Sequence, residues 1–189
     1  MKLPPLILAS ASPRRAELLR QLYSDFQVIP GDAAEIFDEQ LSPWELCQLN
    51  AHRKARAVAK KIPDALVLGA DTLVFLNAEI MGKPANLAEA TRMLTRLQGR
   101  THQVVTGVSL ILLRAHRERT FAVGTDVTFR PLTAEQIEGY LSKTNPLDKA
   151  GAYAIQEHGD LIVSEISGSF SNVVGLPVEQ VQAELEAWK

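Results

Sequence analysis

A mixed β-sheet flanked by helices is the fold class that the sequence predicts. Two apolar runs, LILAS at residues 6–10 and ALVLGAD at 65–71, are typical of buried strands that end in polar side chains. Segments with helical spacing and capping signals lie among the strand patterns, without strict alternation of the two kinds. A length of 189 residues favours a single domain over residues 1–189.

The remaining elements follow from local patterns. Further strands are expected at 26–30, at TLVFL (72–76) as a second extended piece, and at 101–113, 119–130 and 160–167. Helix starts are expected near Ser12, at Ser42, Asn86 and Thr133, and near Pro177. The segment 31–41 has no clean periodicity, so we interpret it as a loop that could carry part of a functional site.

The helix that begins at Ser42 is the clearest of these predictions. Ser42 and Glu45 form a capping box, with Pro43 at the first helical position. One apolar stripe is expected to face the core, formed by Trp44, Cys47, Ala51, Ala55 and Val58. Lys54 falls at the edge of that stripe, where it either extends its ammonium group to water or reaches into a cleft.

Composition limits the classes of function. A formal net charge of −2 and 6% aromatic residues argue against an extended nucleic-acid-binding surface. The one cysteine, Cys47, rules out an intrachain disulfide and fits a reducing compartment. The apolar run near the N-terminus is too short to cross a membrane. The sequence therefore predicts a cytoplasmic protein with neither a nucleic-acid nor a membrane partner.

Two arginines stand at an unusual place. In ASASPRRAELL (9–19), Ser12 suits an N-cap and Pro13 the first helical position, so Arg14 and Arg15 fall in the first turn. The helix dipole is positive there, and acidic residues are preferred. Cations at this position indicate that the helix start binds an anion.

Asp71 is the leading candidate for chemistry, because a carboxylate at the end of an interior strand is costly unless it is paired or binds a metal. Lys83 lies in a GKP loop, and DKAGAYAIQ (148–156) combines charged and small residues. Each is also compatible with an ordinary surface or turn role. Together, the two arginines, Lys54, Lys83, the hydroxyls of Ser10 and Ser12 and the carboxylates resemble a polyphosphate site.

The segments LILASASPRRAELL, GADT, GKP, PLDKAGAYAIQ and NVVGLP resemble, in order and spacing, the Maf family of nucleoside triphosphate pyrophosphatases. The resemblance covers nearly the whole chain. It implies an elongated, curved mixed sheet with a central cleft, similar to that of inosine triphosphate pyrophosphatases. It also implies cleavage between the α and β phosphates, dependent on a divalent metal cation, Mg²⁺ or Mn²⁺, and a homodimer.

The resemblance assigns roles residue by residue. Asp71 matches the proton acceptor that deprotonates the attacking water. The positions that hold the triphosphate correspond to Ser10, Arg15, Lys54 and Lys83, and we add Ser12 as a neighbouring hydroxyl. Glu35 and Asp71 are the expected metal ligands. Many relatives carry two adjacent acids where this chain has Ala34 and Glu35, with Asp32 and Asp38 as nearby alternatives.

Three positions bear on the choice of base. Arg14, Thr72 and Gln156 resemble the branch of the family that acts on dTTP and UTP, whereas the branch acting on 7-methyl-GTP has Trp, Gln and Glu there. A guanidinium and a neutral amide suit the carbonyls and N3–H of a pyrimidine. Two alternatives stay open: the same chemistry on 7-methyl-GTP or another modified nucleotide, and a nucleotide-binding regulator of cell division and septum formation.

Overall fold

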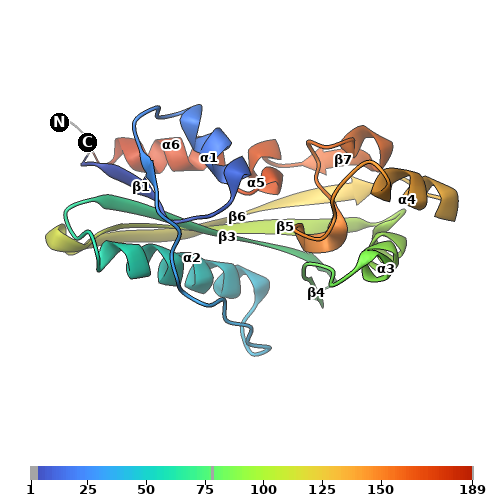
Figure 1. The fold of residues 1–189 in the computed structure, drawn as a ribbon, viewed down its shortest axis with the longest axis horizontal. Helices are drawn as coiled ribbons and strands as arrows, with labels where there is room; N and C mark the ends of the chain where they lie inside the picture. The colour runs from blue at the N-terminus through green and yellow to red at the C-terminus, as the bar shows by residue number, and fades with distance from the viewer. Residues whose placement is uncertain (1–3, 78, 189) are drawn as a thin grey trace. The chain divides into compact units, whose positions relative to one another are not determined.

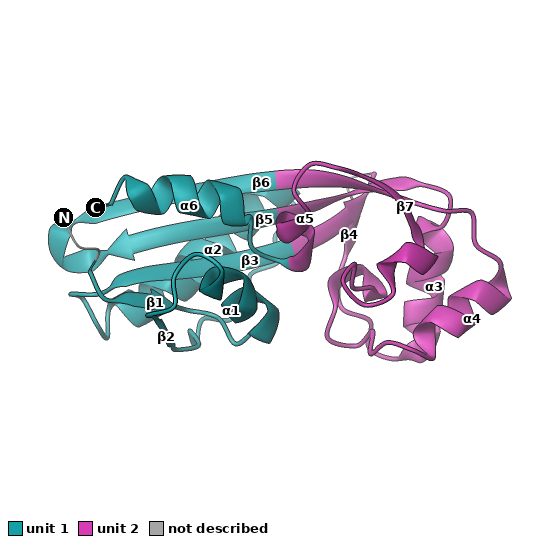
Figure 2. Cartoon of the chain, turned by 90° about the horizontal axis from the view of Figure 1, so that it is seen from above, with its two compact units in different colours: residues 1–72, 106–123, 175–189 teal, residues 73–105, 124–174 magenta. Residues whose placement is uncertain are grey.

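The structure, a computed structural model, describes residues 4–77 and 79–188. The chain divides into two compact units (Figure 2). Unit 1 comprises residues 1–72, 106–123 and 175–189, and unit 2 comprises residues 73–105 and 124–174. The prediction of a single domain over residues 1–189 stays a prediction.

The strands form a mixed sheet, as predicted. Its order is β2-β1-β3-β5-β6-β7, with β4 paired to β3. β1 is parallel to both β2 and β3, whereas the β3–β4 and β6–β7 pairs are antiparallel. The strands span β1 (Leu6–Leu8), β2 (Gln27–Val28), β3 (Leu66–Leu76), β4 (Glu79–Met81), β5 (Thr101–Leu112), β6 (Arg117–Phe129) and β7 (Val163–Ser167).

The helices begin where the capping signals predict, except for the short helix at Phe170–Val174. They span α1 (Pro13–Arg20), α2 (Pro43–Ala59), α3 (Leu87–Leu97), α4 (Ala134–Leu141), α5 (Phe170–Val174) and α6 (Val178–Glu186). The predicted capping box of Ser42 and Glu45 is present, and the side chains of Asn86 and Thr133 also accept bonds from the helices that follow them. No helix within residues 4–77 and 79–188 combines the length and apolar character needed to cross a membrane.

Some sequence predictions were wrong in detail. Residues 66–76, predicted as two extended pieces, form the single strand β3, and the three residues before the GKP loop, Glu79–Met81, pair with it as the unpredicted strand β4. The strand expected at 26–30 shortens to Gln27–Val28, and helix α5 was not predicted. These short segments carry weak periodicity, so pairing and packing decide their structure.

In unit 1, helices lie on both faces of the sheet, with α2 on one face and α1 and α6 on the other (Figure 1). α2 packs unusually close to the strands. A Cβ at Gly69 of β3 would lie 2.4 Å from the carbonyl oxygen of Ala51, and one at Gly107 of β5 would lie 2.4 Å from that of Cys47. The absence of side chains at these glycines therefore permits the close approach of α2 to the strands.

The buried stripe of α2 differs from the prediction at one residue. Cys47, Ala51, Ala55 and Val58 are buried as expected, but Trp44 is 37% exposed. Leu46 and Asn50 are buried as well. Trp44 lies in the first turn, before α2 reaches its close contact with the strands at Gly107, so a large ring there remains at the surface.

Unit 2 has its own core, built around aromatic rings. His102 of β5 meets Phe129 and Tyr153 edge-on, with ring centroids 4.9 and 5.4 Å away, and its Nε2 lies 2.8 Å from the Tyr153 hydroxyl. Burial lowers the pKa of His102 to about 4 and raises that of Tyr153. The imidazole is therefore neutral near pH 7 and acts as a structural member of this core.

Candidate active site

Asp71 of β3 lies in a cluster of charged side chains in unit 1. Its carboxylate is buried, with 6% of the side chain exposed, and its Oδ1 accepts a hydrogen bond of 2.6 Å from Nζ of Lys54. The same Nζ donates to Oε1 of Glu35 at 2.7 Å. One ammonium group thus joins the strand acid to the loop acid. Lys54 does not extend to water: 15% of its side chain is exposed.

The close packing of α2 explains how Lys54 reaches this position. Gly69 lies two residues before Asp71 and lets the backbone of α2 approach β3 at Ala51 and Ala55. Lys54 stands between these two alanines in the sequence, at the edge of the buried face. A lysine at that rim therefore turns its ammonium group toward the carboxylate.

Arg15 forms the second part of the site. Its Nε donates to the carbonyl oxygen of Gly175 at 2.8 Å, its Nη1 to Oγ of Ser10 at 3.1 Å and its Nη2 to Oγ1 of Thr72 at 2.9 Å. Three of the five N–H groups of a guanidinium are thereby used, which leaves two for an anion. Desolvation lowers the pKa of Arg15, while the charges of Asp71 and Glu35 raise it. The guanidinium is thus fixed within electrostatic reach of both carboxylates.

The position of Asp71 and Thr72 along β3 explains how the two parts meet. β1 pairs with β3 as far as Leu8 opposite Leu68, and Ala9 still donates to the carbonyl oxygen of Leu68. β3 continues beyond that point to Asp71 and Thr72. Because these are successive residues of a strand, their side chains point to opposite faces of the sheet. α2 supplies Lys54 from one face and α1 supplies Arg15 from the other. The end of β1 therefore marks where the cations from both faces gather.

The start of α1 matches the prediction only in part. Ser12 is the N-cap residue, but its side chain makes no capping bond, and its N–H donates to Oγ of Ser10 at 3.2 Å. The first turn holds Pro13, Arg14 and Arg15 and no acid. No acidic side chain in the first turn therefore compensates the positive N-terminal end of the α1 dipole, and a bound anion can do so.

Residues that the sequence did not single out also belong to this site. Oγ1 of Thr106 lies 3.0 Å from Oγ1 of Thr72, and the carbonyl oxygen of Gly175 accepts from Arg15. Asn50 of α2 donates to Oδ2 of Asp71 at 3.4 Å. The contacts of Thr106 and Gly175 join segments 34 to 160 residues apart, so no local pattern indicates them. A signal for Asn50 existed: it stands one helical turn before Lys54.

Two predicted site residues lie in unit 2, Lys83 after β4 and Gln156 in the 148–156 motif, and both are exposed. Their segments are held together within that unit, because the N–H of Gly151 donates to the carbonyl oxygen of Gly82 at 3.0 Å. The hydroxyl of Tyr140 bonds both the N–H and the carbonyl oxygen of Ala154, two residues before Gln156. The loops that carry Lys83 and Gln156 thus have fixed positions relative to each other.

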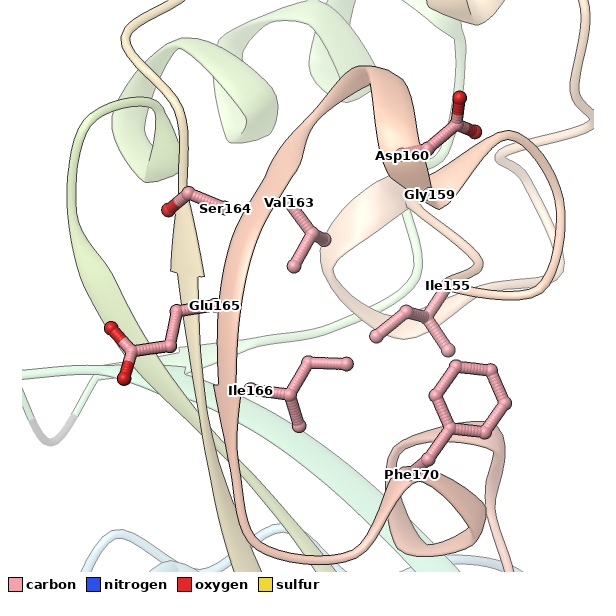
Figure 3. Close-up of a pocket in the computed structure, with 8 residues that line it drawn as sticks. All are labelled: Ile155, Gly159, Asp160, Val163, Ser164, Glu165, Ile166 and Phe170. Atoms are coloured by element: carbon pink, nitrogen blue, oxygen red, sulfur yellow. The ribbon is translucent and has the colours of Figure 1, made fainter.

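A hollow of about 300 Å³ also lies in unit 2 (Figure 3). Its apolar side chains, Ile155, Val163, Ile166 and Phe170, point toward one another, whereas Asp160 and Glu165 point away from them. An apolar floor with its charges directed outward does not suit a phosphate chain, so this hollow is distinct in chemistry from the cluster around Asp71.

The arrangement in unit 1 can bind an anion and hold a carboxylate beside it. A carboxylate has about four acceptor positions, and the two bonds from Lys54 and Asn50 leave capacity on Asp71 for a water molecule. Cys47, a buried residue of α2, takes no part as a nucleophile, because burial and the charge of Asp71 raise its pKa to about 12.

Comparison with known proteins identifies the family. The family model described as "Maf-like protein" matches residues 5–188. The chain belongs to the Maf family. Similar proteins include one from Akkermansia muciniphila, 47% identical over 95% of this chain and 94% of its own length. One from Moorella thermoacetica is 50% identical over 94% of this chain and 91% of its own length. Both are named dTTP/UTP pyrophosphatase.

The fold of this Maf protein is also similar to a solved structure of lower sequence identity. The Staphylococcus aureus Ham1 protein matches with a TM-score of 0.56 and 21% identity, over 98% of this chain and all of that chain. This likeness concerns the fold alone, and it agrees with the predicted mixed sheet flanked by helices.

Proposed function

We propose that this Maf protein hydrolyses dTTP and UTP, together with base-modified pyrimidine relatives of them, to the nucleoside monophosphate and diphosphate. The observation that carries the proposal is the junction of Lys54 with Asp71 and Glu35, next to a guanidinium fixed by Ser10 and Thr72. The relatives named dTTP/UTP pyrophosphatase support the same substrate class.

The triphosphate is held by cations from separate elements. Arg15 directs its two remaining N–H groups to phosphate oxygens, and the hydroxyls of Ser10 and Ser12 stand beside it at the start of α1. Lys54 contributes its ammonium group next to Asp71, and Lys83 contributes a further positive charge from its loop. Charge-assisted bonds of this kind neutralise the phosphates and favour the leaving diphosphate.

A divalent cation, Mg²⁺ or Mn²⁺, fits the donor set at Asp71 and Glu35. Mg²⁺ is commonly bound by one or two carboxylates together with substrate phosphates and water. The carboxylates of Glu35 and Asp71 both bond the ammonium group of Lys54, so their oxygens already converge on one position that carries positive charge. When bound, such an ion polarises the phosphate oxygens and stabilises the charge that develops on them.

The chain's own residues carry the proton transfer and the orientation. Asp71 is the general base: it accepts a proton from the water that attacks the α phosphorus in line with the leaving diphosphate. Lys54 holds the carboxylate in place through Oδ1, so that the remaining acceptor positions face the water. Arg15 stabilises the negative charge on the phosphate oxygens as the bond between the α and β phosphates breaks.

Base selection is assigned to Arg14, Thr72 and Gln156. The guanidinium of Arg14 and the amide of Gln156 suit the carbonyls and N3–H of a pyrimidine. Thr72 acts more indirectly, since its hydroxyl already contacts Arg15 and Thr106. We further infer a cytoplasmic homodimer with the nucleotide as its small-molecule partner.

A panel of nucleoside triphosphates tests this proposal. Diphosphate release is measured for dTTP, UTP, CTP and 7-methyl-GTP, each with Mg²⁺ and with Mn²⁺. We expect the highest kcat/KM for dTTP and UTP, and no release without a divalent cation. Preference for 7-methyl-GTP would contradict the base assignment. Nucleotide binding without hydrolysis in the presence of metal would instead identify a regulator.

A further inference from the structure

Asn50 is a buried polar residue to which the mechanism above assigns no part. Its side chain lies on α2, and the residue is 3% exposed. A buried amide is costly unless its donors and acceptor are satisfied. The partners of Asn50 therefore indicate what it does, and they all belong to the surroundings of Asp71.

Two bonds of Asn50 fasten the loop between β2 and α2. Its Oδ1 accepts from the backbone N–H of Ile36 at 2.8 Å, and its Nδ2 donates to the carbonyl oxygen of the same residue at 3.1 Å. One side-chain amide thus pairs both backbone groups of Ile36, much as a neighbouring strand would. The segment 31–41 contains neither helix nor strand, so this pairing gives the loop a defined position.

The fastened residue directly follows Glu35. Fixing the backbone of Ile36 therefore limits where Glu35 can place its carboxylate, which is 57% exposed and bonds Lys54. A long exposed side chain loses conformational entropy when it is held in one ion pair. Because the backbone of Ile36 is already fixed, the loop loses fewer conformations when Glu35 forms this ion pair, and the entropic cost is smaller.

The third contact of Asn50 reaches the strand acid. Its Nδ2 donates to Oδ2 of Asp71 at 3.4 Å, while Lys54 donates to Oδ1 of the same carboxylate at 2.6 Å. Asn50 and Lys54 are four residues apart on α2 and lie on one side of the helix. Two donors from adjacent turns of one helix thus hold the two oxygens of Asp71.

We propose that Asn50 is a positioning residue that couples the loop bearing Glu35 to Asp71, so that both carboxylates are held in one arrangement around Lys54. The inference rests on the proposed pyrophosphatase function. Asn50 acts through the two acids and not through phosphate contacts of its own. Its loss should therefore lower kcat and leave the KM for nucleotide nearly unchanged.

The test compares Asn50→Leu with a matched control, Gln48→Leu. Leucine keeps the branched shape of asparagine and removes its hydrogen bonds. Gln48 carries an amide on the same helix, but it bonds only the carbonyl oxygen of Trp44 among the contacts described. We expect N50L to lower kcat for dTTP about tenfold or more, with KM changed less than about threefold. Q48L should leave both values unchanged.

Two further readouts separate positioning from a general loss of structure. Hydrogen exchange at the Ile36 amide should accelerate in N50L, while exchange in the middle of α2 stays as in the wild type. In a double-mutant cycle with Glu35→Gln, the combined loss of kcat should be smaller than the product of the single losses. Should N50L fail to fold, Asn50→Ser replaces it, because a smaller hydroxyl leaves room for water.

The outcomes are distinct. A wild-type kcat in N50L, unchanged exchange at Ile36, or multiplicative losses in the cycle with E35Q would each overturn the positioning role. If the wild-type protein does not hydrolyse dTTP or UTP, the proposed function fails, and the exchange of Ile36 in N50L still decides whether Asn50 fastens the loop.

Discussion

Replacing Lys54 by methionine leaves the buried carboxylate of Asp71 without its cation. The chain supplies a matched comparison: Lys61 and Asp32 form an ion pair with the same N–O distance of 2.6 Å. The two pairs differ in burial. The side chains of Lys54 and Asp71 are 15% and 6% exposed, whereas those of Lys61 and Asp32 are 61% and 79% exposed.

The expected magnitude follows from that difference. Removing one partner of a fully buried ion pair destabilises a protein by about 3–5 kcal/mol. Asp71 keeps its bond from Asn50, and Lys54 is partly exposed, so we expect Lys54→Met to cost roughly 2–3 kcal/mol. For a chain of this size, that corresponds to a decrease in Tm of roughly 4–12 °C. Lys61→Met should leave the Tm unchanged, because exposed pairs contribute little.

Thermal unfolding followed by circular dichroism at pH 7 measures both variants under the same conditions. The double variant K54M/D71N should recover most of the lost Tm, because it removes the uncompensated carboxylate charge together with the cation. Equal Tm shifts in K54M and K61M, or no recovery in the double variant, would refute the reasoning that burial makes this pair important.

Three further predictions concern other parts of the molecule. Burial lowers the pKa of His102 from 6.5 to about 4. The unfolded chain therefore binds the proton first as the pH falls. The free energy of unfolding decreases by about 3 kcal/mol between about pH 6.5 and about pH 4. In His102→Gln, the free energy of unfolding measured with urea should fall less steeply over this pH range. Gly69→Ala should destabilise the protein, since its Cβ would lie 2.4 Å from a carbonyl oxygen of α2, whereas Gly139→Ala, with open space around it, should be neutral or stabilising in the same Tm measurement. Arg14→Trp should reduce the ratio of kcat/KM for UTP to that for 7-methyl-GTP, and an unchanged ratio would remove Arg14 from the residues that select the base.

Local signals account for the parts of the fold that the sequence predicted. Ser42, Asn86 and Thr133 each cap a helix through their own side chains, so a few adjacent residues determine where these helices begin. By contrast, the strand Glu79–Met81 exists because it pairs with β3, and the helix Phe170–Val174 is too short to show a period. Both depend on contacts that no short window of sequence contains.

The candidate site divides in the same way. Asp71 was recognisable because a carboxylate ended an apolar run, and Lys54 because it stood at the rim of a buried helical face. Asn50 was overlooked because an isolated asparagine in a helix resembles a surface residue until Ile36 is seen against it. The hydrogen bonds that Arg15 donates to Thr72 and to the carbonyl oxygen of Gly175 could not be predicted either, because Gly175 is 160 residues distant from Arg15.

The central claim is that Asp71 acts as the base at a site where cations bind the triphosphate. Diphosphate release from dTTP by Asp71→Asn measures it most directly, because asparagine keeps the shape of the side chain and cannot accept the proton as a carboxylate does. We expect a decrease in kcat of about 10²-fold or more, with the cooperative thermal unfolding of the wild type retained. A folded D71N variant that releases diphosphate at a rate near that of the wild type would contradict the account.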